Sequence, residues 1–282
     1  MKLRRFVFDK LWIAATFATV VIAVVPLLSI LADVVYQGIA SMNIDFFTQL
    51  PPPPCSAATC TPGGLGNAIQ GTIILVALSG AIGIPIGIIS GIYISEYGNN
   101  SYGSSVRFLG DVLAGIPSIV TGVLVYVLIV IPLRGYSVTA GGIALGSMII
   151  PIVSNTSAEA LKTVPNSIRE ASHALGIRKW RTSLLIAAHA KRAIATASLL
   201  AIARITGETA PLLLSAGISQ LWFSGLDHPI ASLTFYIYYF ATSPYANWKA
   251  LAWGAAFILI VIVLGINMGV RIITRTKEVY SS

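Results

Sequence analysis

Six long uncharged or nearly uncharged stretches, separated by short polar segments, run along this 282-residue chain. Each stretch reaches the roughly 20 residues that an α-helix needs to cross the hydrocarbon core of a bilayer. The pattern predicts an all-α polytopic membrane protein whose residues 1–282 form a single transmembrane domain. The predicted spans cover about residues 11–35, 68–95, 108–132, 137–158, 192–216 and 250–272.

The distribution of Lys and Arg predicts how these spans are oriented. Most of the 18 basic residues precede the first span, follow the second, lie in the loop at 159–191 or follow the last span. Because positively charged loops remain in the cytoplasm, both chain ends and the 159–191 loop are predicted to be cytoplasmic. We expect the first span to be retained, since its apolar stretch is longer than the core of a typical signal peptide.

The composition agrees with a membrane protein and excludes an ordinary soluble domain. Hydrophobic residues make up 56% of the chain and charged residues only 10%, with a mean hydropathy of +0.83. A soluble domain carries about a quarter charged residues. The net charge of +8 comes from the cytoplasmic loops and ends, so it indicates topology and not nucleic-acid binding.

Two long segments are predicted to lie on the external side of the membrane. The first contains the proline run Pro51–Pro54, followed by Cys55 and Cys60. An oxidising exterior permits a disulfide between these cysteines, and two free thiols are the alternative. The second segment, residues 215–248, is rich in aromatic residues and is expected to lie at the membrane interface, where such rings are common.

Small residues and prolines mark particular faces of the predicted spans. Gly83, Gly87 and Gly91 repeat at intervals of four, which predicts a helix face that a neighbouring backbone can approach closely. Four consecutive spans contain a proline, which leaves a backbone carbonyl without its usual helical donor. Such breaks persist in membranes where protein or a water-filled cavity meets them, which favours a transport pathway over simple kinking. The prolines are Pro85, Pro117, Pro151 and Pro211.

Arg204 and Glu208 are two charged residues within the fifth predicted span. A charge near the bilayer centre costs roughly 2.5–3.5 kcal/mol on insertion scales, so such residues usually serve a function. Their spacing of four residues places both groups on one face of a helix. One interpretation is a structural pair in which each charge satisfies the other. In the second, Arg204 lines the path of an anion, with Glu208, Thr206 and Pro211 at the same place.

The sequence pattern of the 159–191 loop predicts a short helix. Ser167-Ile168-Arg169-Glu170 has the form of a capping box just after Pro165, and Gly176 is a natural stop. Ile168, Ala171 and Leu175 fall on one face at helical spacing. From physics alone, this helix suits either a partner's groove or the membrane surface.

A family resemblance distinguishes these alternatives. Glu170-Ala171-Ser172-x-x-x-Gly176 resembles the "EAA" loop of binding-protein-dependent ABC importer permeases, with Ser172 in place of the usual alanine. In that family the loop is the coupling helix that docks on the cytosolic ATPase. The resemblance therefore implies the type I ABC importer permease fold and assigns ATPase coupling to Glu170, Ala171, Ser172 and Gly176.

Three further stretches narrow the resemblance to the A-type permeases of phosphate importers. They are Leu113-Ala-Gly-Ile-Pro-Ser-Ile-Val120, Arg204-Ile-Thr-Gly-Glu-Thr-Ala-Pro-Leu212 and Ser243-Pro-Tyr-Ala-Asn-Trp248. This resemblance implies phosphate import together with a homologous C-type permease subunit, two ATPase subunits and an extracytoplasmic phosphate-binding protein. It also makes Arg204 a reasonable contact for the anion.

No enzyme activity of its own is expected from this chain. It has no Gly-Lys dipeptide and hence no Walker A loop, so ATP is expected to bind to a partner subunit and not to this chain. The three histidines are scattered, and no metal site or other cofactor is predicted. The alternatives are a permease for sulfate or molybdate and a stand-alone channel or secondary carrier.

Overall fold

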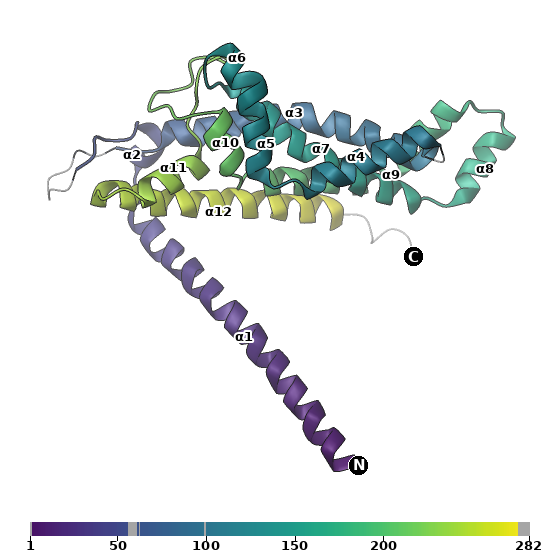
Figure 1. Ribbon diagram of the computed structural model, residues 1–282, viewed down its shortest axis with the longest axis horizontal. Coiled ribbons are helices and arrows are strands. Elements are labelled where there is room, and N and C mark those ends of the chain that lie inside the picture. The colour runs from purple at the N-terminus through teal and green to yellow at the C-terminus, as the bar shows by residue number, and fades with distance from the viewer. Residues whose placement is uncertain (1, 56–60, 62, 99, 276–282) are drawn as a thin grey trace.

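The computed structural model describes residues 2–55, 61, 63–98 and 100–275, and within them the chain is helical with no strand (Figure 1). The predicted all-α class is confirmed. In chain order the elements are α1 (Lys2–Ala40), α2 (Ile44–Thr48), α3 (Gly66–Tyr97), α4 (Ser101–Gly115), α5 (Ser118–Val125), a π-helical turn (Tyr126–Val130), α6 (Ile131–Leu133), α7 (Val138–Lys162), α8 (Asn166–Ala174), α9 (Lys179–Ile205), α10 (Ala210–Ser215), α11 (Leu233–Ala241) and α12 (Ala246–Arg275).

Within the described residues, five helices are long and apolar enough to cross a membrane, and a bent pair makes six if it counts as one span. The bent pair is α4 with the segment Ser118–Leu133, whose axes differ by 103°. The predicted span at 108–132 falls within this bent pair, and the bend lies at Pro117, one of the four predicted prolines. Pro117 ends the helix because it has no backbone N–H to donate to the Leu113 carbonyl, which accepts a 3.4 Å hydrogen bond from Ile116 instead.

The predicted fifth span at 192–216 also differs from the structure. Helix α9 begins at Lys179 and ends at Ile205, and α10 starts only at Ala210. The expected loop at 159–191 is shortened accordingly. The charged residues Arg181, Lys191 and Arg192 lie on α9 with their side chains exposed, so they do not interrupt its backbone hydrogen bonds. The helix therefore begins well before the uncharged stretch from which its start was predicted.

Within the described residues, α3 and α7 make the most extensive contact of any two helices. A Cβ atom added at Gly83 would lie 2.6 Å from the Ile149 Cβ, and one at Gly87 would lie 2.8 Å from the Val153 Cβ. Gly91 approaches the Ser154 carbonyl in the same way. The predicted packing face is confirmed, and its recipient is α7.

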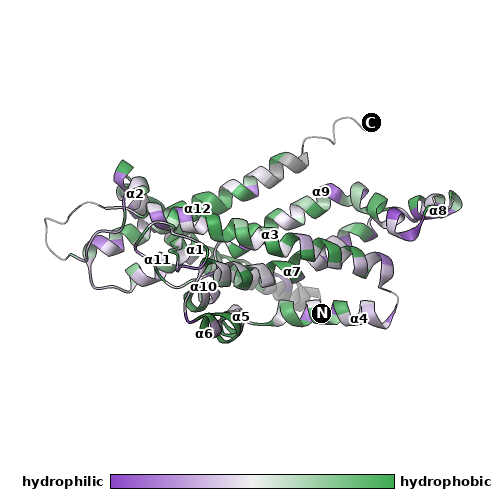
Figure 2. Ribbon diagram, turned by 90° about the horizontal axis from the view of Figure 1, so that it is seen from above, coloured by the Kyte–Doolittle hydropathy of each residue, from purple (hydrophilic) through white to green (hydrophobic). Residues whose placement is uncertain are grey.

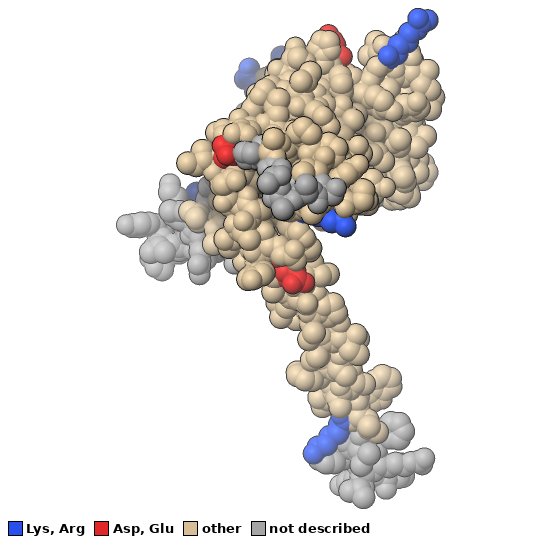
Figure 3. All heavy atoms as spheres, turned by 90° about the vertical axis from the view of Figure 1, so that its left-hand side faces the viewer, with Lys and Arg blue, Asp and Glu red and all other residues tan. Residues whose placement is uncertain are grey.

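Helix α1 projects away from the body of the molecule, while α3, α7, α9 and α12 run side by side (Figure 1). Only its last turns contact the body, where Gly38 lies against Phe257 and Trp253 of α12. The side chains along its length are almost all exposed and apolar. Figure 3 shows that most of the α1 surface between its two ends is uncharged, which suits lipid and not water.

Side chains from the start of α12 hold the predicted external loop. Asn247 donates to the Pro53 carbonyl at 2.9 Å and accepts from the Cys55 amide at 3.2 Å, while Trp248 Nε1 donates to the Pro52 carbonyl at 3.0 Å. Cys55 is disulfide-bonded. Its expected partner, Cys60, lies outside the described residues.

The aromatic segment is partly a packed core and not only an interfacial belt. Tyr236 and Phe240 of α11 are fully buried and stack with ring centroids 4.7 Å apart. The Tyr236 hydroxyl donates to the Ser219 carbonyl at 2.7 Å, and burial raises the pKa of Tyr236 to about 12. The phenol therefore remains a donor at neutral pH and holds the loop before α11.

Candidate substrate pathway and coupling site

A cavity of about 220 Å³ lies where several helices are bent or broken. Its walls come from the α4–α5 bend, the middle of α7 and the end of α9. The lining residues are Leu113, Ala114, Ile116, Pro117, Ser118, Met148, Pro151, Ile152, Arg204 and Glu208. Two of the four predicted prolines, Pro117 at the α4–α5 bend and Pro151 inside the continuous helix α7, therefore line a cavity that both predicted intramembrane charges also line.

Arg204 and Glu208 share this cavity but do not have the expected helical geometry. Helix α9 ends at Ile205, and the Glu208 amide donates to the Ile205 carbonyl, so Glu208 lies beyond the last helical turn. The two side chains, both within the described part of the chain, form no ion pair with each other. The predicted placement on one helix face is wrong, because Gly207 follows the end of the helix. The Arg204 side chain is exposed and Glu208 is partly buried.

Thr206 and Pro211, which were predicted to join the pathway, do not line this cavity. The Thr206 hydroxyl donates to the Ile202 carbonyl at 2.7 Å, and the residue borders a separate, apolar cavity between α3, α9 and α12 that also includes Pro85. Pro211 is buried near the start of α10, where its Cα would lie 2.8 Å from a Cβ added at Gly122. Both residues shape the end of α9 and the start of α10.

Polar contacts fix the walls of the cavity. The Asn155 amide of α7 donates to the Asp111 carboxylate of α4 at 3.2 Å, one turn from Pro151. The Thr234 hydroxyl at the start of α11 donates to the Glu208 carbonyl at 3.1 Å. A guanidinium facing a space of this size is able to neutralise and hydrogen-bond a small anion.

Helix α8 lies at the far end of the molecule from α2 and α11 (Figure 1), and hydrophilic residues gather on it (Figure 2). It begins after Pro165 as predicted, but Pro165 occupies the N-cap position and no side chain caps the helix. The expected capping box is wrong, because Ser167 already lies within the first turn.

The end of α8 agrees with the prediction. Gly176 has a φ of +68°, its amide donates to the His173 carbonyl at 3.0 Å, and the Ile177 amide donates to the Ser172 carbonyl at 3.0 Å. These two bonds form a Schellman motif, which requires the left-handed conformation that glycine adopts most easily. Gly176 thus stops the helix.

The residues predicted to couple to the ATPase divide between two faces of α8. Glu170, Ala171 and Leu175 are exposed, whereas Ser172 is buried and donates to the Ile168 carbonyl at 2.8 Å. Ile168 packs against the buried cluster that includes Leu161 and Ile186. Ile168 is therefore half-buried, whereas Ala171 and Leu175, which follow it at helical spacing, are exposed.

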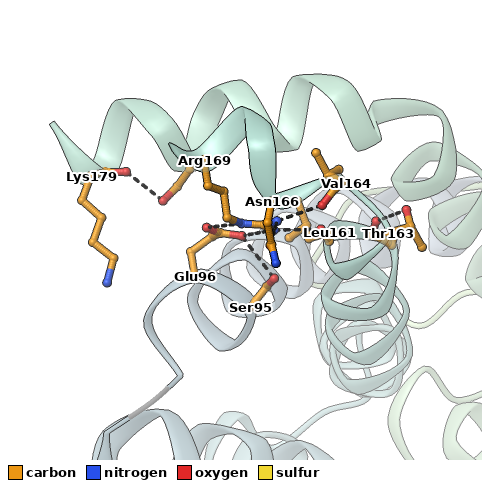
Figure 4. Close-up of polar contacts among 10 residues, drawn as sticks. Ser95, Glu96, Leu161, Thr163, Val164, Asn166, Arg169 and Lys179 are labelled. Atoms are coloured by element: carbon orange, nitrogen blue, oxygen red, sulfur yellow. Dashed lines mark hydrogen bonds and ion pairs between the residues drawn. The ribbon is translucent and has the colours of Figure 1, made fainter. Parts of the chain in front are cut away.

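Arg169 ties α8 to two other helices, a contact that the sequence analysis missed (Figure 4). Its guanidinium donates to both carboxylate oxygens of Glu96, at 2.8 Å and 3.3 Å, and to the Leu161 and Val164 carbonyls. The Glu96 side chain is only 8% exposed. Because 73 residues separate the partners, no spacing signal in the sequence connects them.

Comparison with known proteins defines the class to which this fold and site belong. Residues 83–278 match the family model described as "Binding-protein-dependent transport system inner membrane component". The chain belongs to this family. With its membrane-length helices, it is a multi-pass inner-membrane permease.

The particular relatives are phosphate transport system permease proteins PstA. The chain is 42% identical to the PstA of Yersinia pestis, over 96% of this chain and 91% of that protein. It is 39% identical to the PstA of Haemophilus influenzae, over 96% and 95% of the two chains. A probable PstA of Methanocaldococcus jannaschii is 30% identical over 95% and 94%. The resemblance to A-type permeases is confirmed.

Solved structures show the same fold. A chain of the inward-facing MetNI methionine ABC transporter superposes with a TM-score of 0.62 at 17% identity, covering 74% of this chain and 95% of that one. A chain of an amino acid ABC transporter determined with histidines gives 0.53 at 19% identity, covering 73% and 92%. The predicted ABC importer permease fold is confirmed.

Proposed function

We propose that this chain is the membrane-spanning permease subunit of an ATP-driven importer of inorganic phosphate. The observation that carries the proposal is the near full-length similarity to PstA proteins at up to 42% identity. The same similarity disfavours a permease for sulfate or molybdate and a stand-alone channel or carrier.

The proposed importer has further subunits. A homologous C-type permease completes the pathway, an extracytoplasmic phosphate-binding protein delivers the anion, and two ATPase subunits bind and hydrolyse ATP. This chain holds no cofactor and catalyses no reaction itself. Closure of the ATPases draws the coupling helices together and switches the paired permeases between inward- and outward-facing states.

Helix α8 is the proposed ATPase-coupling helix. Its exposed face carries Glu170 and Ala171, and its end is fixed by Gly176. Ser172 contributes from the buried inner face of α8, where its hydroxyl is satisfied within the helix by the Ile168 carbonyl. This assignment places α8 and both chain ends in the cytoplasm, in accordance with the distribution of Lys and Arg.

Arg204 is the proposed anion contact in the cavity. Its charge is not offset by an ion pair with Glu208, so a phosphate passing the cavity supplies the missing counter-charge. Glu208 limits how tightly the anion is held, because a nearby carboxylate repels it. Thr206 and Pro211 contribute indirectly, since they shape the break that brings Glu208 beyond the end of α9.

Uptake measurements on the complex co-purified with its partners test this function. ATP-dependent phosphate uptake into vesicles is expected, with sulfate and molybdate failing to compete. Arg204→Ala should reduce uptake at least tenfold, and Arg204→Lys should retain part of it because the positive charge remains. Arg192→Ala is the matched control, since Arg192 is exposed on the same helix but does not line the cavity.

Two results would contradict the proposal at different levels. Uptake of sulfate or molybdate in preference to phosphate would overturn the substrate. Wild-type phosphate uptake by Arg204→Ala would leave the substrate unchanged and make Arg204 a structural residue.

A further inference from the structure

The guanidinium of Arg169 joins three helices at the end of the molecule where α8 lies (Figure 4). It pairs with Glu96 in the last turn of α3 through both carboxylate oxygens. It also donates to the Leu161 carbonyl at 3.0 Å and to the Val164 carbonyl at 2.9 Å, just where α7 ends, and to Asn166 Oδ1 at 3.1 Å. A cation at this position satisfies terminal carbonyls of α7 and interacts favourably with its helix dipole.

We propose that the Arg169–Glu96 pair is a positioning link that transmits movement of α8 to the α3–α7 pair and thereby to the wall of the anion cavity. The inference rests on the proposed function, because it assumes that a motor subunit moves α8. Neither residue touches the substrate in this arrangement, so both act through the helices that they join.

The path from α8 to the cavity is continuous. The chain itself connects α8 to α7 and to α9, and Arg169 adds a connection to α3. Along the membrane, α3 and α7 are held together by the close approach of Gly91, Gly87 and Gly83 to α7. Ile149 contacts Gly83, and its neighbours Met148, Pro151 and Ile152 form the α7 wall of the cavity. Two helices packed backbone to backbone move together more readily than they slide.

Burial distinguishes this pair from an ordinary surface ion pair. The side chains of Arg169 and Glu96 are 21% and 8% exposed, so water does not replace either partner when the other is removed. The pair Lys162–Glu159 lies nearby on α7 with side chains 51% and 71% exposed. Exposed pairs contribute little, which makes Glu159→Gln the matched control for Glu96→Gln.

The test uses the complete complex with Glu96→Gln, Arg169→Gln, the double variant and Glu159→Gln. Three quantities are measured: the amount of assembled complex, its ATPase rate and its ATP-driven phosphate uptake. We expect Glu96→Gln to assemble within twofold of the parent and to hydrolyse ATP, but to lose uptake at least tenfold. The double variant should be no worse than Arg169→Gln alone, because both residues act through one link. Glu159→Gln should match the parent.

A second measurement does not depend on the identity of the substrate. A thiol is introduced in the cavity wall by Ser118→Cys, and its labelling rate is compared with and without ATP and vanadate. We expect the nucleotide to change the rate in the otherwise unaltered complex and to leave it unchanged when Glu96→Gln is added.

Each other outcome counts against the link. Uptake within twofold of the parent in Glu96→Gln, or a labelling change that survives Glu96→Gln or never occurs, would overturn it. Loss of assembled complex in proportion to lost uptake would make the pair merely structural. If the parent complex takes up no phosphate, the proposed function fails, and the labelling result still decides whether the link operates.

Discussion

At the scale of single residues, the absence of a side chain is as important as the presence of a charge. Gly87 on α3 allows the α7 backbone to approach so closely that a Cβ would lie 3.0 Å from the Ile150 carbonyl and 2.8 Å from the Val153 Cβ. The approach adds van der Waals contact in lipid, where the hydrophobic effect does not hold apolar helices together.

Replacing Gly87 by Leu should therefore separate α3 from α7. Overpacking of a well-packed site costs about 1–3 kcal/mol, and here the backbone itself must shift. We expect a lower melting temperature of the purified protein in detergent. Gly265→Leu on α12 is the control, because a Cβ at Gly265 meets no atom within 4 Å. Equal melting temperatures of the two variants would contradict the packing role.

At the scale of elements, the glycine turn that ends α8 determines the bounds of this helix more than a hydrophobic pattern does. Its nine residues are too few for a stable isolated helix, so contacts with α7, α9 and α3 must hold it. Gly176 turns the chain back toward α9 through the Schellman motif, and this turn sets the angle at which Glu170 and Ala171 are presented.

Gly176→Val should disturb this presentation without preventing insertion. A β-branched residue in the left-handed conformation costs roughly 1–2 kcal/mol, so the turn is expected to open. ATP-driven uptake should fall several-fold while the amount of protein in the membrane stays constant, and Glu170→Ala should also uncouple transport. Gly135→Ala is the control, since Gly135 has open space and no positive φ. Normal uptake by both coupling variants would disprove the coupling assignment.

At the scale of the whole molecule, the two ends of the helical body carry different elements. One end carries α8, and the other carries α2, α11 and the proline loop, with membrane-length helices between them (Figure 1). Along α1 the exposed surface is apolar for most of its length, so lipid or another membrane helix must cover it.

Thiol labelling in intact cells checks the predicted orientation. Leu221 and Leu175 lie toward opposite ends and are 68% and 79% exposed. A membrane-impermeant reagent should label Leu221→Cys directly and Leu175→Cys only after permeabilisation. Direct labelling of Leu175→Cys would place α8 outside and remove the proposed ATPase contact.

The sequence by itself determined the membrane class, the helical fold, the packing face of α3 and the stop at Gly176. These depend on local properties: the length of apolar stretches, the absence of a Cβ and the backbone freedom of glycine. The family could be recognised from short motifs around Glu170 and Glu208, because the residue order of such motifs does not depend on how the helices pack.

Only the tertiary structure decided the bend at Pro117, the end of α9 before Glu208, and the pairing of Arg169 with Glu96. A proline is compatible with both a continuous helix, as at Pro151 in α7, and a broken one, and neighbouring helices select between them. Likewise, residues far apart in the chain meet only when their helices have packed. The charges were visible in the sequence, but their partners depended on packing between helices.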